Sequence, residues 1–226
     1  MAKRREQIEL VIERLLREGS AVARKDGSHH DLFPITISAE VGNTLREWVR
    51  KEDARVTIEV GLAYGLSALH ICAGLNDNGY ADATHVAIDP FQLNGPDGVG
   101  FAGCALQFLD EAGVASMVEH IEEESQIALP RLVGDGPRFD LGFIDGNHRF
   151  ERVFLDLYYL GRLVRPGGII ILDDYEFPGI VKAASFFTSN LKWSIEDART
   201  VGPHGWAVLR TSDKEDTRHF TYFVDF

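Results

Sequence analysis

Acidic side chains lie at the ends of four of the apolar, strand-like segments of this 226-residue chain. They are Glu59, Asp89, Asp145 and the adjacent pair Asp173 and Asp174. Carboxylates that gather at one place raise each other's pKa unless a cation lies among them. Oxygen ligands of this kind suit Mg²⁺, Mn²⁺ or Ca²⁺ better than Zn²⁺. The pattern therefore predicts that some of these acids hold a divalent cation.

A histidine lies three residues after one of these acids, in the segment from Asp145 to His148. If Asp145 holds a cation, His148 is well placed to take a proton from a hydroxyl group. A cation on the hydroxyl oxygen would lower the pKa of that hydroxyl and fix its direction. Alternatively, His148 starts a helix and bonds only locally, and Asp173 and Asp174 form a plain turn. The residues alone leave both interpretations open.

Residues 56–74, VTIEVGLAYGLSALHICAG, predict a strand, a tight turn and a helix. The turn has small residues at alternate positions and then a residue type that caps helices: Gly61, Ala63, Gly65 and Ser67. Small residues let a ligand touch the backbone, and a helix start offers unpaired N–H groups to an anion. Glu59, just before the turn, would repel a pyrophosphate but suits a ligand with an ammonium group. The spacing differs from the dinucleotide fingerprint, and a turn without a ligand stays open.

The spacing of apolar residues places the acids at the ends of strands. The predicted strands are residues 56–60, 84–88, 117–121, 139–144 and 169–172. The predicted helices are residues 4–18, 38–51, 104–112, 151–164 and 180–189, with one more from Ser67. Residues 19–34 predict a loop, and the predicted edge strands are 192–196, 206–210 and 220–224.

This alternation implies an α/β, Rossmann-like doubly wound sheet with helices on both faces. The sheet is expected to be mostly parallel with an antiparallel C-terminal edge. Ligands bind such sheets outside the carboxyl ends of the strands. We therefore expect the acids to share one rim.

Three further segments have ligand-binding interpretations. Asp89 ends the second strand, where an acid can accept both hydroxyls of a ribose, although it could be an ordinary loop aspartate. Residues 91–103 form a glycine-rich loop where a substrate lid would lie. Glu124 and Ser125 follow the third strand and could meet the amino group of an adenine. A run of acids such as residues 122–124 is also typical of a solvated edge.

Composition limits the classes that remain. The length and 45% hydrophobic residues fit one domain, residues 1–226, with an N-terminal helical cap (1–51) and a core (52–226). A net charge of −12 argues against nucleic acid. The N-terminus has no secretory pattern and no apolar run reaches the roughly 18 residues that a membrane helix needs. We expect a cytoplasmic protein with free thiols at Cys72 and Cys104. The amphipathic helix 4–18 either docks on the domain or pairs in a homodimer.

Three passages carry a resemblance to a known family: EVGLAYGLS, FIDGNHRFERVFLDL and LVRPGGIIILDDY. With them, residues 35–210 resemble the class I S-adenosylmethionine-dependent methyltransferases. The last two passages resemble the small-domain O-methyltransferases of the catechol and macrolide-sugar types. The resemblance implies S-adenosylmethionine as cofactor, a divalent metal such as Mg²⁺, and a small-molecule hydroxyl acceptor, either a sugar, a natural product or a phenol.

The resemblance also implies roles for single residues. The metal ligands would be Asp145, Asp173 and Asp174. The catechol type usually has Asn as third ligand and Lys as base, whereas Asp174 and the base His148 are closer to the sugar type. The cofactor-binding residues would be Glu59, Gly61, Ala63, Gly65 and Ser67 at the methionine end, Asp89 at the ribose, Glu124 and Ser125 at the adenine, and Asp145 beside the metal.

Three other functions remain as alternatives. A metal-free methyltransferase would use His148 as its only base. A protein that binds S-adenosylmethionine without turnover would have no need of a base beside metal-binding acids. A nicotinamide oxidoreductase would bind NADH, and Glu59 beside the turn argues against it.

Overall fold

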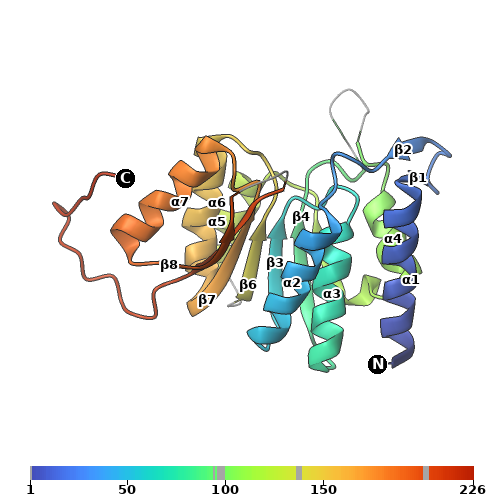
Figure 1. The fold of residues 1–226 in the computed structure, drawn as a ribbon, viewed down its shortest axis with the longest axis horizontal. Coiled ribbons are helices and arrows are strands. Elements are labelled where there is room, and N and C mark those ends of the chain that lie inside the picture. Colours follow the sequence, from blue (N-terminus) through green and yellow to red (C-terminus); the bar gives the residue numbers. More distant parts are fainter. Residues whose placement is uncertain (1, 94, 96–99, 136–138, 201–203) are drawn as a thin grey trace. The chain divides into compact units, whose positions relative to one another are not determined.

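The computed structural model describes residues 2–93, 95, 100–135, 139–200 and 204–226, and the chain divides into two compact units, residues 1–125 and 126–226. Figure 1 shows that strands alternate with helices in both units. This alternation confirms the predicted α/β, Rossmann-like class.

The first unit contains three parallel strands. β3 (Val56–Val60) pairs with β4 (Thr84–Ile88), and β4 pairs with β5 (Val118–Ile121). Val60 lies opposite Ile88, and Ile88 lies opposite Ile121, so the three strands end at the same level. The residues that follow the strands therefore meet at one edge of this unit.

Four helices and a short 3₁₀ turn complete the first unit. They are α1 (Ala2–Glu18), α2 (Ala39–Lys51), α3 (Leu66–Asn78), α4 (Cys104–Glu111) and the turn Ala115–Met117. In Figure 1 α3 lies beside α1 and α2, and it packs against both. Every residue of α3 from Leu66 to Asn76 is buried. An apolar surface on all sides is what a helix with neighbours on several faces requires.

The two predicted helix starts in this unit have different outcomes. The Ser38 side chain caps α2 and accepts a hydrogen bond from the Val41 N–H at 3.3 Å, which confirms that start. The expectation that Ser67 begins α3 is wrong. Gly65 is the N-terminal cap, with φ 78° and no side-chain bond, and Ser67 lies inside the first turn.

The prediction of a loop over residues 19–34 is also wrong. β1 (Ser20–Val22) and β2 (His29–Asp31) form an antiparallel hairpin. Each strand has only three residues, and neither has the apolar alternation that indicates a strand in a sequence.

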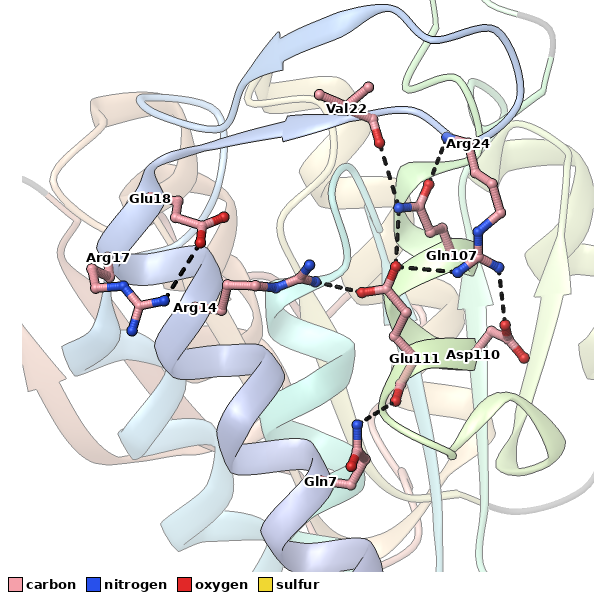
Figure 2. A network of polar contacts seen from close by, with 9 residues as sticks. All are labelled: Gln7, Arg14, Arg17, Glu18, Val22, Arg24, Gln107, Asp110 and Glu111. Atoms are coloured by element: carbon pink, nitrogen blue, oxygen red, sulfur yellow. Dashed lines mark hydrogen bonds and ion pairs between the residues drawn. The ribbon is translucent and has the colours of Figure 1, made fainter.

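Polar contacts join this hairpin, α1 and α4, as Figure 2 shows. The Arg24 guanidinium contacts Asp110 at 3.1 Å and Glu111 at 3.2 Å, and Arg14 forms an ion pair with Glu111. The Gln7 side chain donates to the Glu111 carbonyl at 3.0 Å. Ile8, Val11, Ile12 and Leu15 of α1 are buried. The apolar face of α1 therefore docks within its own unit, as one of the two alternatives had it.

The described residues of the second unit form four strands. β6 (Phe139–Ile144) is parallel to β7 (Val164–Asp173), β9 (Trp206–Arg210) is antiparallel to β7, and β8 (Ser194–Arg199) is antiparallel to β9. The antiparallel C-terminal edge is thereby confirmed. Its helices are α5 (Ser125–Asp135), α6 (Phe150–Leu163) and α7 (Pro178–Leu191), and α6 packs on β6, β7 and α7. The sequence patterns did not predict α5, which contains Pro130.

The predicted edge strand at residues 220–224 is wrong. This tail has no strand, and the Asn190 side chain of α7 exchanges two 2.9 Å hydrogen bonds with the Val224 backbone. The Phe226 ring packs on Phe186, with ring centres 5.1 Å apart. The tail therefore contacts α7 through Val224 and Phe226 instead of joining the sheet, and Phe220 is 91% exposed.

Two further expectations concern the whole chain. Cys72 and Cys104 are buried and free, as predicted, and burial raises the pKa of both thiols, that of Cys104 to about 11. Among the described residues, no helix combines the length and the apolar character that a bilayer crossing requires.

Candidate functional site

The turn at residues 61–65 has an unusual backbone. Gly61, Ala63 and Gly65 all have positive φ, at 95°, 42° and 78°. A Cβ on Gly65 would lie 2.9 Å from the Cβ of Ala105 in α4. The small residues are therefore required by the conformation of the turn and by the close approach of α4.

Asp89 holds this turn in place. Its Oδ2 accepts hydrogen bonds from the N–H groups of Leu62 at 3.0 Å and Ala63 at 2.9 Å, and its Oδ1 accepts one from Phe91 at 2.7 Å. The side chain is only 4% exposed. Asp89 thus has a structural role that the sequence did not suggest, and its ribose role stays a prediction.

Glu59 lies directly before the turn and is fully buried with His85 of β4. Their closest atoms, Glu59 Oε1 and His85 Nε2, are 3.1 Å apart. The Thr57 hydroxyl lies 2.9 Å from the other ring nitrogen of His85. Sequence reasoning missed His85, although the pairing of β3 and β4 places it opposite Thr57.

The other predicted cofactor residues lie at the same edge of the first unit. Glu124 is exposed, and Ser125 is the first residue of α5. Of the preceding acids, Glu122 accepts a hydrogen bond from the Leu93 N–H at 2.9 Å. Residues 94 and 96–99 of the predicted lid lie outside the described residues, and the lid stays a prediction.

A histidine of the hairpin approaches the turn. His30 Nδ1 lies 3.3 Å from the Tyr64 hydroxyl, and the Tyr64 ring packs edge-on against Phe101. The sequence showed two adjacent histidines in an apparent loop and gave no signal for this contact. The structure therefore adds the β1–β2 hairpin to the surroundings of the turn.

The second unit gathers three acids and two histidines, which we call the acid–histidine cluster: Asp145, His148, Asp173, Asp174 and His204. Ligand atoms of Asp145, His148 and Asp174 lie within 4.8 Å of one another, and so do those of Asp173, Asp174 and His204. His148 Nε2 lies 3.1 Å from Asp174 Oδ2 and 3.5 Å from Asp145 Oδ1. Asp174 thus belongs to both groups.

Strand pairing positions the cluster. Ile144 of β6 lies opposite Leu172 of β7, so the residues after both strands are neighbours. Asp174 has φ 52°, in the left-handed region that Asp adopts more readily than most residues. The ring of His148 packs against Phe177, the cap of α7, at 5.6 Å between ring centres.

The electrostatics of the cluster favour a bound cation. Burial, and then the charges of Asp145 and Asp174, raise the pKa of Asp173 to about 9. Asp173 is 3% exposed, and its Oδ1 has no hydrogen-bond partner in the described part of the chain. Burial also raises the pKa of Asp174, and a hydrogen bond to Asp145 raises that of His148. A divalent ion would neutralise the crowded carboxylates, so these residues fit such an ion.

Comparison with known families agrees with this arrangement. A family profile described as "Methyltransferase domain" matches residues 58–175, more than half of the chain. The chain belongs to this methyltransferase family.

Curated and structural relatives are consistent with that membership. A caffeoyl-CoA O-methyltransferase of Populus kitakamiensis is 26% identical over 168 residues, which cover 74% of this chain but only 64% of the plant protein. An O-methyltransferase from Bacillus cereus, solved with S-adenosylhomocysteine, superimposes with a TM-score of 0.69 at 18% identity, covering 90% of this chain and 91% of the other. TomG from Streptomyces achromogenes, solved with S-adenosylmethionine, gives 0.63 at 23% identity, with 92% and 90% covered. The methyltransferase therefore has the class I fold.

The methyltransferase brings together most of the residues that its sequence predicts. Asp145, His148, Asp173 and Asp174 lie in one cluster, although Asp145 and Asp173 fall in different ligand groups within it. The turn residues and Asp89 are in contact in the first unit. His204 was missed, because it lies 30 residues after Asp174 in a segment without a motif.

Proposed function

We propose that this methyltransferase transfers a methyl group from S-adenosylmethionine to a hydroxyl oxygen of a small molecule, with the help of a divalent metal. The observation that carries the proposal is the acid–histidine cluster in a chain of the methyltransferase family. Carboxylates and a histidine at hydrogen-bond distance from one another are what metal-assisted deprotonation of a hydroxyl requires.

The first unit would bind the cofactor. Positive-φ residues in the 61–65 turn allow close approach to the backbone, and the α3 N-terminus suits the carboxylate of the methionine part. Buried Glu59 would favour the ammonium group of the same part. The assignment of Asp89 to the ribose, and of Glu124 and Ser125 to the adenine, completes the proposed set, with Ser67 in the first turn of α3.

The second unit would prepare the acceptor. The transfer forms an oxygen–carbon bond, breaks a sulfur–carbon bond and releases the hydroxyl proton. Asp145, Asp173 and Asp174 would hold Mg²⁺, Mn²⁺ or Ca²⁺, which when bound lowers the pKa of a hydroxyl. His148 would accept the proton on its imidazole ring, and Asp145 and Asp174, which face Nε2, would stabilise the imidazolium that forms. Its side chain is 41% exposed, which leaves room for an acceptor.

The relatives support a choice of acceptors to test. The name of the plant relative refers to a caffeoyl ester, so phenols with adjacent hydroxyls are the first acceptors to test and sugars the second. Two neighbouring hydroxyls can both bind a single cation, which would fix the reacting oxygen. We also propose a cytoplasmic location without nucleic acid, in keeping with the net charge of −12. The homodimer stays a prediction.

The test is methyl transfer from labelled S-adenosylmethionine to a panel of catechols and sugars, with and without EDTA. We expect transfer to at least one catechol, loss with EDTA, and recovery with Mg²⁺ or Mn²⁺. His148→Gln should lower kcat by about 10²–10⁴-fold, whereas His219→Gln, in the exposed tail, should not.

Each alternative predicts a different result. Transfer that resists EDTA but needs His148 would show a metal-free methyltransferase. Tight calorimetric binding of S-adenosylhomocysteine without transfer to any acceptor would favour a binding protein. Binding of NADH in place of S-adenosylhomocysteine would favour an oxidoreductase.

A further inference from the structure

The pairing of β7 with β9 brings an unpredicted histidine to the acid–histidine cluster. Asp173 lies opposite Trp206 in this antiparallel ladder, so the residues after Asp173 run beside those before Trp206. The Tyr175 N–H donates to the Gly205 carbonyl at 3.0 Å and extends the pairing by one step. His204 is thereby placed next to Asp174.

The Glu176 carboxylate clamps the backbone of this segment. Its Oε1 accepts a hydrogen bond from the His204 N–H at 3.1 Å, and its Oε2 accepts one from the Gly205 N–H at 2.7 Å. A Cβ at position 205 would lie 2.7 Å from Glu176 Oε2 and 2.5 Å from the Arg199 carbonyl oxygen. Only glycine fits at position 205, so the two hydrogen bonds to Glu176 depend on this residue.

Two residues of the acid–histidine cluster have left-handed backbones. Asp174 has φ 52° and His204 has φ 59°. Non-glycine residues keep such conformations only where the surroundings fix them, and they gather at functional sites. Here the fixed backbones bring the ligand atoms of Asp173, Asp174 and His204 within 4.8 Å of one another.

An independent observation points to a ligand at this place. Asp173 is 97% buried, and its Oδ1 has no hydrogen-bond partner among the described residues. An orphaned carboxylate oxygen at such depth is costly unless a donor or a cation meets it.

We propose that His204 supplies an imidazole nitrogen to the divalent cation held by Asp173 and Asp174, and that Glu176 is the positioning residue that holds His204 there. The inference rests on the proposed metal-dependent function and extends it. Carboxylates and water suit Mg²⁺, Ca²⁺ and Mn²⁺, and of these three ions Mn²⁺ is the first-row transition metal, the class that imidazole suits. A mixed ligand set would therefore favour Mn²⁺ over Mg²⁺ and Ca²⁺.

The test is pulsed electron paramagnetic resonance of the full chain loaded with Mn²⁺, which detects ¹⁴N nuclei bound to the ion. We expect ¹⁴N modulation in the wild type and its reduction or loss in His204→Gln. His219→Gln, an exposed tail histidine, is the matched control and should keep the signal. Modulation that is absent from the wild type, or unchanged in His204→Gln, would overturn the proposal.

Variants of Glu176 test its positioning role. Glu176 binds the backbone of His204 and is not in either ligand group. Substitution of such a supporting residue typically lowers metal affinity by about 10–100-fold. Glu176→Gln keeps one acceptor oxygen and Glu176→Ala keeps none, so Mn²⁺ affinity and ¹⁴N modulation should fall in that order. A lower melting temperature with an unchanged ¹⁴N signal would show a merely structural role and contradict the assignment.

The outcomes also separate this inference from the proposed function. If Mn²⁺ does not bind to the wild type at all, the metal-dependent function and this inference both fail. If Mn²⁺ binds, supports methyl transfer and shows no dependence of ¹⁴N modulation on His204, only this inference fails.

Discussion

Asp89 in the first unit and Asp173 in the second are equally buried but are held in opposite ways. Asp89 is 4% exposed, and its two oxygens accept three hydrogen bonds from backbone N–H groups. Asp173 is 3% exposed, but its Oδ1 has no partner in the described residues, and burial and then the neighbouring acids raise its pKa. Asp89 is therefore part of what holds the fold together, whereas Asp173 costs stability until something outside the chain neutralises it.

This difference distinguishes a scaffold from a functional site by energy and not by residue type. A buried carboxylate with several N–H donors keeps its charge at low cost. A buried carboxylate among other carboxylates persists because of its use. Substitution of Asp89 should therefore lower stability and substitution of Asp173 should raise it. The predictions below test that contrast.

The largest expected effect is the loss of activity in Asp173→Asn. Removal of one charge from the acid–histidine cluster weakens cation binding, so kcat/KM should fall by about 10²–10⁴-fold. The measurement is methyl transfer at saturating Mg²⁺. Asp197→Asn changes an exposed acid of β8 in the same way and should retain wild-type activity. Full activity in Asp173→Asn would remove this residue from the site.

The second effect is a loss of stability in Asp89→Ala. The variant leaves three backbone N–H groups of Leu62, Ala63 and Phe91 without their acceptor. The free energy of unfolding should fall by about 2–4 kcal/mol, because hydrogen bonds to charged groups contribute more than neutral ones. Urea unfolding followed by circular dichroism measures it, with Asp197→Ala as the control. An unchanged midpoint would mean that Asp89 serves the cofactor alone.

The sequence was sufficient wherever a local pattern decided the structure. The predicted strands at residues 56–60, 84–88 and 139–144 match β3, β4 and β6. Asp89 and Asp145 directly follow β4 and β6, and Glu59 is the last residue but one of β3. Buried parallel strands read as continuous apolar runs, so their ends are easy to locate. We expect the acids at these ends to belong to the site, because the fold class places ligands there.

The sequence was insufficient where tertiary contacts decided the structure. The hairpin at residues 20–31 has strands of three residues, and its contacts come from Arg24 and His30 to distant partners. The aromatic alternation at residues 220–224 predicts a strand, yet the tail packs on α7. His204 joins the cluster through the β7–β9 register and through Glu176, and neither is visible in a single sequence.

The third effect is a gain of stability in Asp173→Asn when no metal is present. The pKa of Asp173 is raised to about 9 in the folded state, above the ordinary value of 3.8. The folded state therefore binds more protons than the unfolded state between these values, and stability falls as pH rises from about 4 to 9. Asn is neutral in both states and needs no proton uptake on folding, so at pH 7 the variant should be more stable by on the order of 1–3 kcal/mol.

Thermal unfolding of the wild type and Asp173→Asn at pH 5, 7 and 9, with EDTA or with Mg²⁺, measures this gain. Mg²⁺ should stabilise the wild type most at high pH and leave Asp173→Asn nearly unchanged. If Asp173→Asn is less stable than the wild type in EDTA, the claim that Asp89 and Asp173 have opposite effects on stability is wrong.

The smallest effect concerns His70 of α3. Like Asp173, this titratable residue is buried and has a polar atom without a hydrogen-bond partner in the described part of the chain. His70 is 3% exposed, and neither ring nitrogen has a hydrogen-bond partner in the described structure. Burial, and then the charge of Arg46, lower its pKa from 6.5 to about 4. The unfolded state binds the extra proton between these values, so stability is full above pH 6.5 and is lost as pH falls toward 4.

His70→Leu should remove this acid-dependent loss, because leucine has a similar size and no group to protonate. At pH 7 the variant should gain about 1–2 kcal/mol, since two buried polar atoms without partners are replaced by apolar ones. Urea midpoints at pH 5 and 7 measure both effects, in Mg²⁺ so that Asp173 does not contribute, with His219→Leu as the exposed control. If the slope between pH 5 and 7 persists in His70→Leu, another group causes the acid sensitivity. If it disappears while Asp173→Asn still changes the slope in EDTA, each unit contains a buried group that makes stability depend on pH, and only that of the second unit responds to metal.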